Sequence, residues 1–191
     1  MKIRHQYIDH KFSWRTSKAQ IEWIVVHYSG IATAQGQAAV VARAIQRSER
    51  ESSTHYVVGE DGIIQLVRDR HRAWHVGGYN TKNKCRAENN NSLGVDLVEH
   101  KRNPKSGSVN DRDWYFTDKV IQDGAELVAE LADRYDIPLD HIVRHYDVTG
   151  KWCPRPFVGK DTNEITGDIH EIGWIMFKER VRLARRCPDD V

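Results

Sequence analysis

The chain has few cysteines and no long apolar run. Three cysteines among 191 residues, without a regular spacing, exclude a small scaffold held together by disulfides. No run of about 18 apolar residues is present, which argues against insertion into a membrane, and residues 1–14 lack the apolar segment of a signal peptide. We therefore expect a protein that is made in the cytoplasm, or one that is exported only if a leader has been removed.

An excess of charge of one sign is also missing. The 29 basic and 27 acidic residues leave a net charge of +2, so no strong field for nucleic acid or a membrane surface is implied. Basic residues crowd only at 68–72 and 180–186, which we interpret as solvated surface. We expect no nucleic-acid partner and no membrane insertion.

The composition suits one compact unit. A chain of this length, 39% hydrophobic, with six Trp and seven Tyr, can bury one core. We expect a polar, irregular N-terminal arm over residues 1–20, one domain over 21–186 and a short tail over 187–191. No internal repeat is visible.

Hydrophobic periodicity predicts a mixed α/β fold. The apolar run of residues 21–28 (IEWIVVHY) predicts a strand buried on both faces, and residues 54–68 predict a hairpin around Glu60-Asp61-Gly62. Helical spacing predicts helices within 34–52, over 117–135 with Thr117 as N-cap, and over 170–186 with Trp174, Phe177 and Val181 inward. The predicted fold class is a single α/β domain with a central mixed sheet flanked by helices.

The segment His141–Pro154 (HIVRHYDVTGKWCP) places an imidazole, an ammonium and a thiol on one loop. A short apolar run delivers His145 to the loop, which then returns Lys151 and Cys153. Neutral imidazole and thiolate are ligands that Zn²⁺ prefers at tetrahedral angles. The segment therefore indicates a zinc site.

A third ligand must come from elsewhere in the chain. His27 ends the most hydrophobic run, at the sheet edge where sites are commonly built. Three protein ligands would leave one position for water, as in catalytic zinc sites. The alternatives are ordinary ones: a hydrogen-bonded or exposed histidine, and a cysteine that serves as a small apolar filler. The other two cysteines, Cys85 and Cys187, are either free thiols or an optional bridge.

Five ordered motifs resemble one known family. The segments VHYSG (26–30), THYVVGEDG (54–62), AWHVGGYN (73–80), NSLGVDLVE (91–99) and HYDVTGKWCP (145–154) stand in the order and spacing of the zinc-dependent N-acetylmuramoyl-L-alanine amidases. The resemblance is greatest to endolysins and autolysins of Gram-positive hosts, and it runs from about residue 20 to 180. It marks residues 21–186 as an amidase catalytic domain with zinc at one end of the strands.

The resemblance implies roles for several residues. It implies zinc ligands at His27, His145 and Cys153, the set reached above from ligand chemistry. It also implies that Lys151 directs its ammonium at the carbonyl oxygen of the scissile amide; the alternative is a solvated loop lysine. The segment AWHVGGYN borders the substrate groove in the family, so Trp74, His75, Tyr79 and Asn80 are candidates for contacting glycan or peptide, although Trp74 could equally be core.

The general base is the point of departure from part of the family. Some branches carry a tyrosine where this chain has Thr54; strand alternation would place Tyr56 on the same face as Thr54. Other branches carry a glutamate where this chain has Asp96, which we predict to be the base. The alternatives for Asp96 are a salt bridge or a hydrogen bond that orients a histidine ligand. Glu99 and His100, just past the strand, are expected to be exposed. His55 could reach the site, but it is expected to be a core histidine held by neighbouring backbone.

The resemblance implies a hydrolase acting on peptidoglycan. The expected reaction is cleavage of the amide between N-acetylmuramic acid and the L-alanine of the stem peptide, by a monomer with Zn²⁺ as cofactor. Two alternatives stay open: a peptidoglycan-binding module without catalysis, and a zinc peptidase that cuts within the stem peptide.

Overall fold

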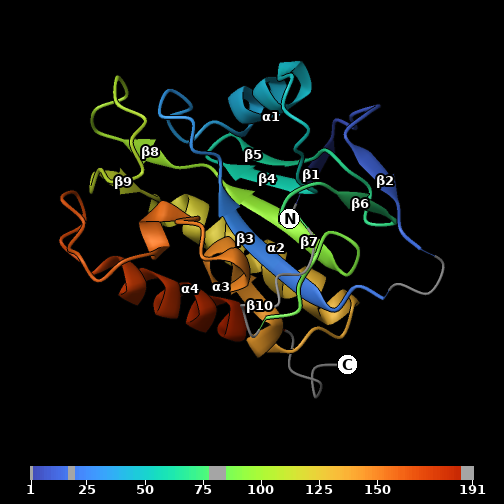
Figure 1. The fold of residues 1–191 in the computed structure, drawn as a ribbon. Helices are drawn as coiled ribbons and strands as arrows, with labels where there is room; N and C mark the ends of the chain where they lie inside the picture. The colour runs from blue at the N-terminus through green and yellow to red at the C-terminus, as the bar shows by residue number, and fades with distance from the viewer. Residues whose placement is uncertain (1, 17–19, 78–84, 186–191) are drawn as a thin grey trace.

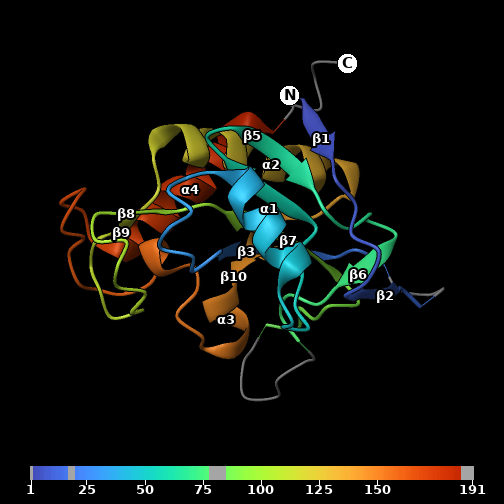
Figure 2. The same cartoon turned by 90° about the horizontal axis from the view of Figure 1, so that it is seen from above.

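The fold is a three-layer arrangement around one mixed sheet. The computed structural model describes residues 2–16, 20–77 and 85–185. Helix α1 covers one face of the sheet, and α2, backed by α4, covers the other (Figures 1 and 2). The strands are β1 (Ile3–His5), β2 (Phe12–Trp14), β3 (Trp23–Tyr28), β4 (Tyr56–Gly59), β5 (Gly62–Gln65), β6 (His71–Ala73), β7 (Ser92–Leu97), β8 (His100–Lys101), β9 (Trp114–Tyr115) and β10 (Ile142–Arg144). The helices are α1 (Ala38–Arg47), α2 (Asp118–Arg134), α3 (His145–Thr149) and α4 (His170–Ala184), with 3-10 turns at Leu139–His141 and Arg155–Phe157.

Six strands form the central sheet in the order β1-β5-β4-β7-β3-β10. Strand β3 runs parallel to β7 on one side and to β10 on the other, and only the β4–β5 hairpin is antiparallel within this sheet. Parallel strands need both faces covered, which matches the nearly uninterrupted apolar sequence of β3. The predicted fold class, central strand and hairpin are confirmed.

Side-chain alternation divides the sheet into two different faces. The α2 face of β3 and β7 carries Ile24, Val26, Leu93, Val95 and Leu97, which are fully buried in the main core. The α1 face of the same strands carries Val25, His27, Gly94 and Asp96, since His27 pairs in register with Asp96. Polar groups are thus concentrated on one face at the carboxyl ends of two parallel strands.

The predicted helices are present with shifted ends. Thr117 is the N-cap of α2, and its side chain accepts a hydrogen bond from the amide of Val120 (3.4 Å). In α4, Trp174, Phe177 and Val181 face inward as predicted. None of the described helices is both long and apolar enough to cross a membrane.

The N-terminal arm is not irregular, so that prediction was wrong. Strand β1 pairs in parallel with β5 and extends the main sheet, while β2 pairs antiparallel with β6. Both strands are only three residues long, and each is stabilised by a strand at least 57 residues away in the chain, with Phe12 against Ala73 and Ile3 against Ile63. Local periodicity cannot reveal strands this short.

Candidate zinc and catalytic site

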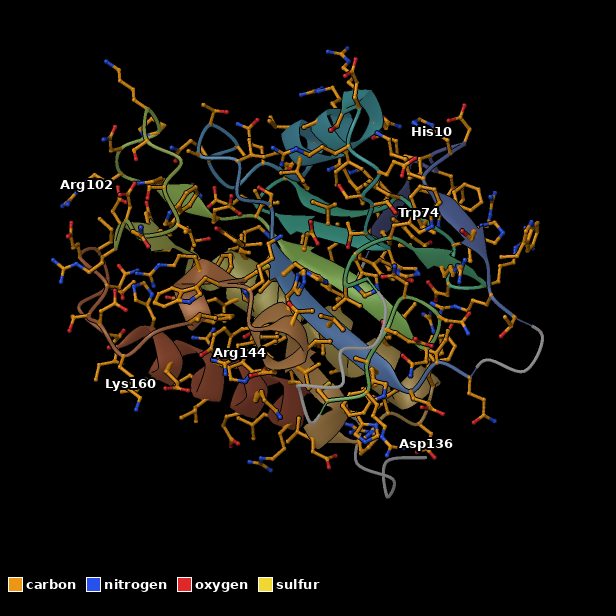
Figure 3. The ribbon with its side chains drawn as sticks, in the orientation of Figure 1. His10, Trp74, Arg102, Asp136, Arg144 and Lys160 are labelled. Carbon is orange, nitrogen blue, oxygen red and sulfur yellow. The ribbon has the colours of Figure 1, made fainter. Side chains whose placement is uncertain are left out.

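Two neighbouring strands deliver the three candidate ligands to one point. His27 lies near the end of β3, and His145 begins α3 directly after β10, the parallel neighbour of β3. The loop after α3 returns Cys153, whose carbonyl accepts a hydrogen bond from the amide of Tyr146 (2.9 Å). Arg144, labelled beside α3 in Figure 3, secures the loop by binding the Asp147 carboxylate (2.7 Å) and the Phe157 carbonyl (2.8 Å).

Two of the three separations between the candidate ligand atoms are close to those of a tetrahedral zinc site. The Nδ1 atoms of His27 and His145 are 3.1 Å apart, and Cys153 Sγ is 3.7 Å from His27 Nδ1. All three candidate ligand atoms lie within 4.8 Å of one another. Bonds of about 2.0–2.1 Å to nitrogen and about 2.3 Å to sulfur would put nitrogens about 3.4 Å apart and nitrogen and sulfur about 3.6 Å apart. The structure thus brings together the three residues that the sequence singled out, in an arrangement that fits zinc.

The electrostatics of the three residues favour a cation. Burial, with the neighbouring His145, lowers the pKa of His27 far below its usual value, and burial with Lys151 lowers the pKa of His145 to about 4. Both imidazoles are therefore neutral at pH 7, the form that binds metal. Burial raises the pKa of the Cys153 thiol to about 12, so its thiolate requires a positive ion for stability.

Asp96 lies beside this cluster with an unusual acidity. Burial raises the pKa of its carboxyl to about 7, the hydrogen bond with Thr54 and the charge of Lys151 lower it, and the nearby Glu99 raises it. A carboxyl that titrates near neutrality can both accept and return a proton. Thr54 thus contacts the predicted base directly.

A cavity joins the cluster to solvent. It has a volume of about 170 Å³, and its lining includes His27, Asp96, His145, Lys151 and Trp74. Lys151 is exposed at this cavity. Trp74, labelled in Figure 3, is half-buried. Its indole nitrogen donates a hydrogen bond to Ser13 Oγ on β2 (2.9 Å).

His75 also lines the cavity, but it is engaged with a candidate ligand. Its Nδ1 lies 3.0 Å from Nε2 of His27, and its Nε2 lies 3.2 Å from Ser92 Oγ. The contact joins residues 48 positions apart, so residue spacing alone does not reveal it. Two other candidate substrate contacts, Tyr79 and Asn80, lie outside the described residues, as does Cys187; Cys85 is a half-buried free thiol.

Two expectations about neighbouring residues were wrong. Tyr56 does not share a face with Thr54, because Thr54 precedes β4; the tyrosine lies in the α2-side core and donates to Asp69 (2.6 Å). Glu99 is 1% exposed and the His100 side chain is 16% exposed, whereas both were expected at the surface. The Glu99 carboxylate accepts hydrogen bonds from Ser29 N and Oγ and from Ile31 N, and thereby holds the segment that follows β3. His55 is a core histidine as predicted, with Nδ1 accepting from Gly94 N (2.9 Å).

The chain is similar to known N-acetylmuramoyl-L-alanine amidases. The model of the N-acetylmuramoyl-L-alanine amidase family matches residues 17–156. The amidase CwlL of Bacillus licheniformis is 32% identical over 157 residues, which are 78% of this chain and 39% of CwlL. A probable N-acetylmuramoyl-L-alanine amidase of the same species is 29% identical over 174 residues, 87% of this chain and 45% of its own. The chain thus spans less than half the length of these curated relatives.

Solved structures share the fold. The catalytic domain of XlyA superposes with a TM-score of 0.64 at 22% identity, covering 95% of this chain and 99% of that domain. PlyL superposes with a TM-score of 0.67 at 19% identity, covering 97% of this chain and all of PlyL (100%). Because the family model matches most of the sequence, this chain belongs to the N-acetylmuramoyl-L-alanine amidase family.

Proposed function

We propose that the domain hydrolyses the amide that joins N-acetylmuramic acid to the L-alanine of the stem peptide in bacterial peptidoglycan. The observation that carries the proposal is the convergence of His27, His145 and Cys153, at zinc-like separations, beside Asp96 and Lys151. Family membership supplies the substrate class. The proposal extends to residues 21–186 as the catalytic unit and to action on the cell wall.

The metal that suits this donor set is zinc. Two neutral imidazoles and a thiolate are a ligand set used by catalytic zinc, which leaves a fourth position open. Zinc, when bound, supplies a nucleophilic water at neutral pH and a Lewis acid for the scissile carbonyl.

The chain's own residues perform the proton and charge steps. Asp96 accepts a proton from the attacking water and returns it to the leaving amine of alanine, which its pKa of about 7 in the metal-free protein permits. Lys151 stabilises the negative charge that develops on the carbonyl oxygen, an effect of about 3 kcal/mol for one well-placed donor. Trp74, at the cavity wall, offers an aromatic surface for a sugar ring.

The test compares two cysteine variants of the whole chain. Cys153→Ser removes the proposed thiolate ligand, whereas Cys85→Ser removes a half-buried thiol outside the cluster and is the matched control. The measurements are zinc content, clearing of a peptidoglycan suspension, and mass spectrometry of the released material. We expect wild type and Cys85→Ser to hold one zinc and to release stem peptides that begin with L-alanine, and Cys153→Ser to lose both properties.

Three outcomes would contradict the proposal in different ways. Release of fragments cut within the stem peptide would identify a zinc peptidase. Binding of zinc and wall without any release would identify a recognition module, and the roles of Asp96 and Lys151 would then be wrong. Full activity in Cys153→Ser would show that the Cys153 thiolate is not a required zinc ligand.

A further inference from the structure

We infer that His75 is a positioning residue for zinc. It holds His27 in the tautomer that has its proton on Nε2, so that the lone pair of Nδ1 faces the metal. The inference rests on the proposed zinc site and assigns a role to a residue that is not itself one of the three candidate ligands. It replaces substrate contact as the principal role of His75.

The evidence is a continuous chain of hydrogen bonds that ends on a backbone carbonyl. His27 Nε2 lies 3.0 Å from His75 Nδ1, and His75 Nε2 lies 3.2 Å from Ser92 Oγ. Ser92 Oγ in turn lies 2.5 Å from the carbonyl oxygen of Glu88. This series of hydrogen bonds connects the loop before β7 to the end of β3.

The last link determines the direction of every proton. A carbonyl oxygen only accepts, so the Ser92 hydroxyl donates to Glu88 and its oxygen accepts from Nε2–H of His75. Neutral His75 then has an unprotonated Nδ1, which must accept from Nε2–H of His27. Neutral His27 is left with an unprotonated Nδ1, 3.1 Å from the Nδ1 of His145. The network therefore selects the tautomer of His27 that can bind a metal.

Metal binding requires the same arrangement of protons. His27 can offer the Nδ1 lone pair to a metal only if its proton lies on Nε2, and Nε2 is the atom that faces His75.

The surroundings hold His75 in place. The Oδ1 atom of Asn89 accepts from three successive backbone amides, those of residues 75 (3.0 Å), 76 (2.9 Å) and 77 (3.1 Å). A Cβ atom at Gly94 would stand 2.7 Å from Cγ of His75, so the ring occupies space that only glycine leaves free. The position of the imidazole is thus determined from two sides.

His55 shows what a purely structural histidine does in the same layer. Its Nδ1 accepts from the amide of Gly94 (2.9 Å), and its Nε2 lies 3.1 Å from the carbonyl of His71. Both ring nitrogens of His55 therefore contact backbone atoms. His75 differs because its Nδ1 ends on a candidate zinc ligand.

The experiment separates ring volume from the acceptor nitrogen. His75→Phe keeps a ring but has no acceptor, whereas His75→Asn places an amide oxygen where Nδ1 stood. His141→Phe is the matched control, because His141 stacks on Trp23 outside the cluster. The zinc dissociation constant of each full-length variant is measured by competition with a chelator, and thermal unfolding of the metal-free proteins reports folding.

We expect the dissociation constant of His75→Phe to rise by about 10- to 100-fold, the usual effect of losing a hydrogen-bond partner of a metal-binding histidine. His75→Asn should recover most of this loss, and His141→Phe should match wild type. Ser92→Ala should weaken zinc binding by a smaller factor. If His75→Phe does not fold, Ser92→Ala and His75→Asn together test the inference.

Wild-type zinc affinity in a folded His75→Phe variant would overturn the inference while leaving the proposed function intact. Equal weakening in the Phe and Asn variants would also overturn it, since volume rather than the acceptor would then matter. If wild type binds no zinc, the proposed function fails together with the inference.

Discussion

Alternate residues of β3 and β7 face opposite sides of the sheet, and the two sides differ in chemistry. On the α2 side, Ile24, Val26, Val95 and Leu97 are fully buried among apolar neighbours. On the α1 side, the partners in register near the strand ends are His27 and Asp96. The apolar side supplies a rigid support, and the polar side uses that support to hold groups whose burial is unfavourable. Substitutions one residue apart should therefore affect either stability or activity.

The largest separation of the two effects is expected for Asp96→Asn. The amide has the shape of the carboxylate but cannot accept a proton, so the rate of stem-peptide release should fall by about 10²- to 10⁴-fold. Unfolding of the metal-free protein should not become easier, because a buried charge has been removed. Rates are measured on purified peptidoglycan with zinc content as control; a variant with more than a tenth of the wild-type rate would show that Asp96 is not the base.

Lys151→Met should reduce the rate by about 10²- to 10³-fold through loss of one oxyanion donor. The exposed Lys160 is the matched control, since Lys160→Met removes the same charge from a residue that does not line the cavity. Both variants should retain zinc. Equal activity of the two variants would show that Lys151 is a solvated loop lysine without a role in the reaction.

Leu97→Ala tests the opposite face. Leu97 follows Asp96 directly, is fully buried, and contacts Gly124 of α2. Truncation should reduce the free energy of unfolding by about 2–5 kcal/mol, as measured by urea denaturation. The rate per folded molecule should stay near wild type, and a rate loss as large as that of Asp96→Asn would mean that the faces are not independent.

The smallest effect concerns acid sensitivity. Burial and the charge of Arg15 lower the pKa of His55 to about 3, against 6.5 for an ordinary histidine. The folded state therefore binds fewer protons than the unfolded chain between these values, and stability falls as the pH drops below about 6.5. At pH 5 this one residue should reduce the free energy of unfolding by about 2 kcal/mol relative to pH 7.5.

His55→Asn isolates this contribution. The variant keeps an acceptor for the Gly94 amide but cannot be protonated, so its stability should depend less steeply on pH over the same range. The comparison is made on metal-free protein by urea denaturation at each pH. Identical slopes for the two proteins would show that His55 titrates normally in the fold.

The fold and the convergence of the three candidate ligands were predictable because their signals are local or specific. Residues 23–26 form an unbroken apolar run, α2 has a clear N-cap, and Cys153 follows His145 by eight residues. Each of these features is determined by residues within one short segment of the sequence. The roles drawn from them stay predictions until the variants above are measured.

The remainder depended on contacts between distant segments. Strands β1 and β2 have three residues each and exist only through their pairing with β5 and β6. The burial of Glu99 follows from amides of Ser29 and Ile31, about 70 residues away. The hydrogen bond between His75 and His27 is of the same kind, since neither residue reveals it alone.

The separation of the three cluster residues along the chain has a consequence for folding. His27 lies 118 residues before His145 and 126 before Cys153. The full set therefore exists only after β10, an edge strand of the sheet, has paired with β3. Metal uptake should be a late event that reports completed folding, and a bound ion should restrain β10 against fraying. Hydrogen exchange of the β10 amides, slowed by added zinc more than exchange elsewhere, would display this coupling.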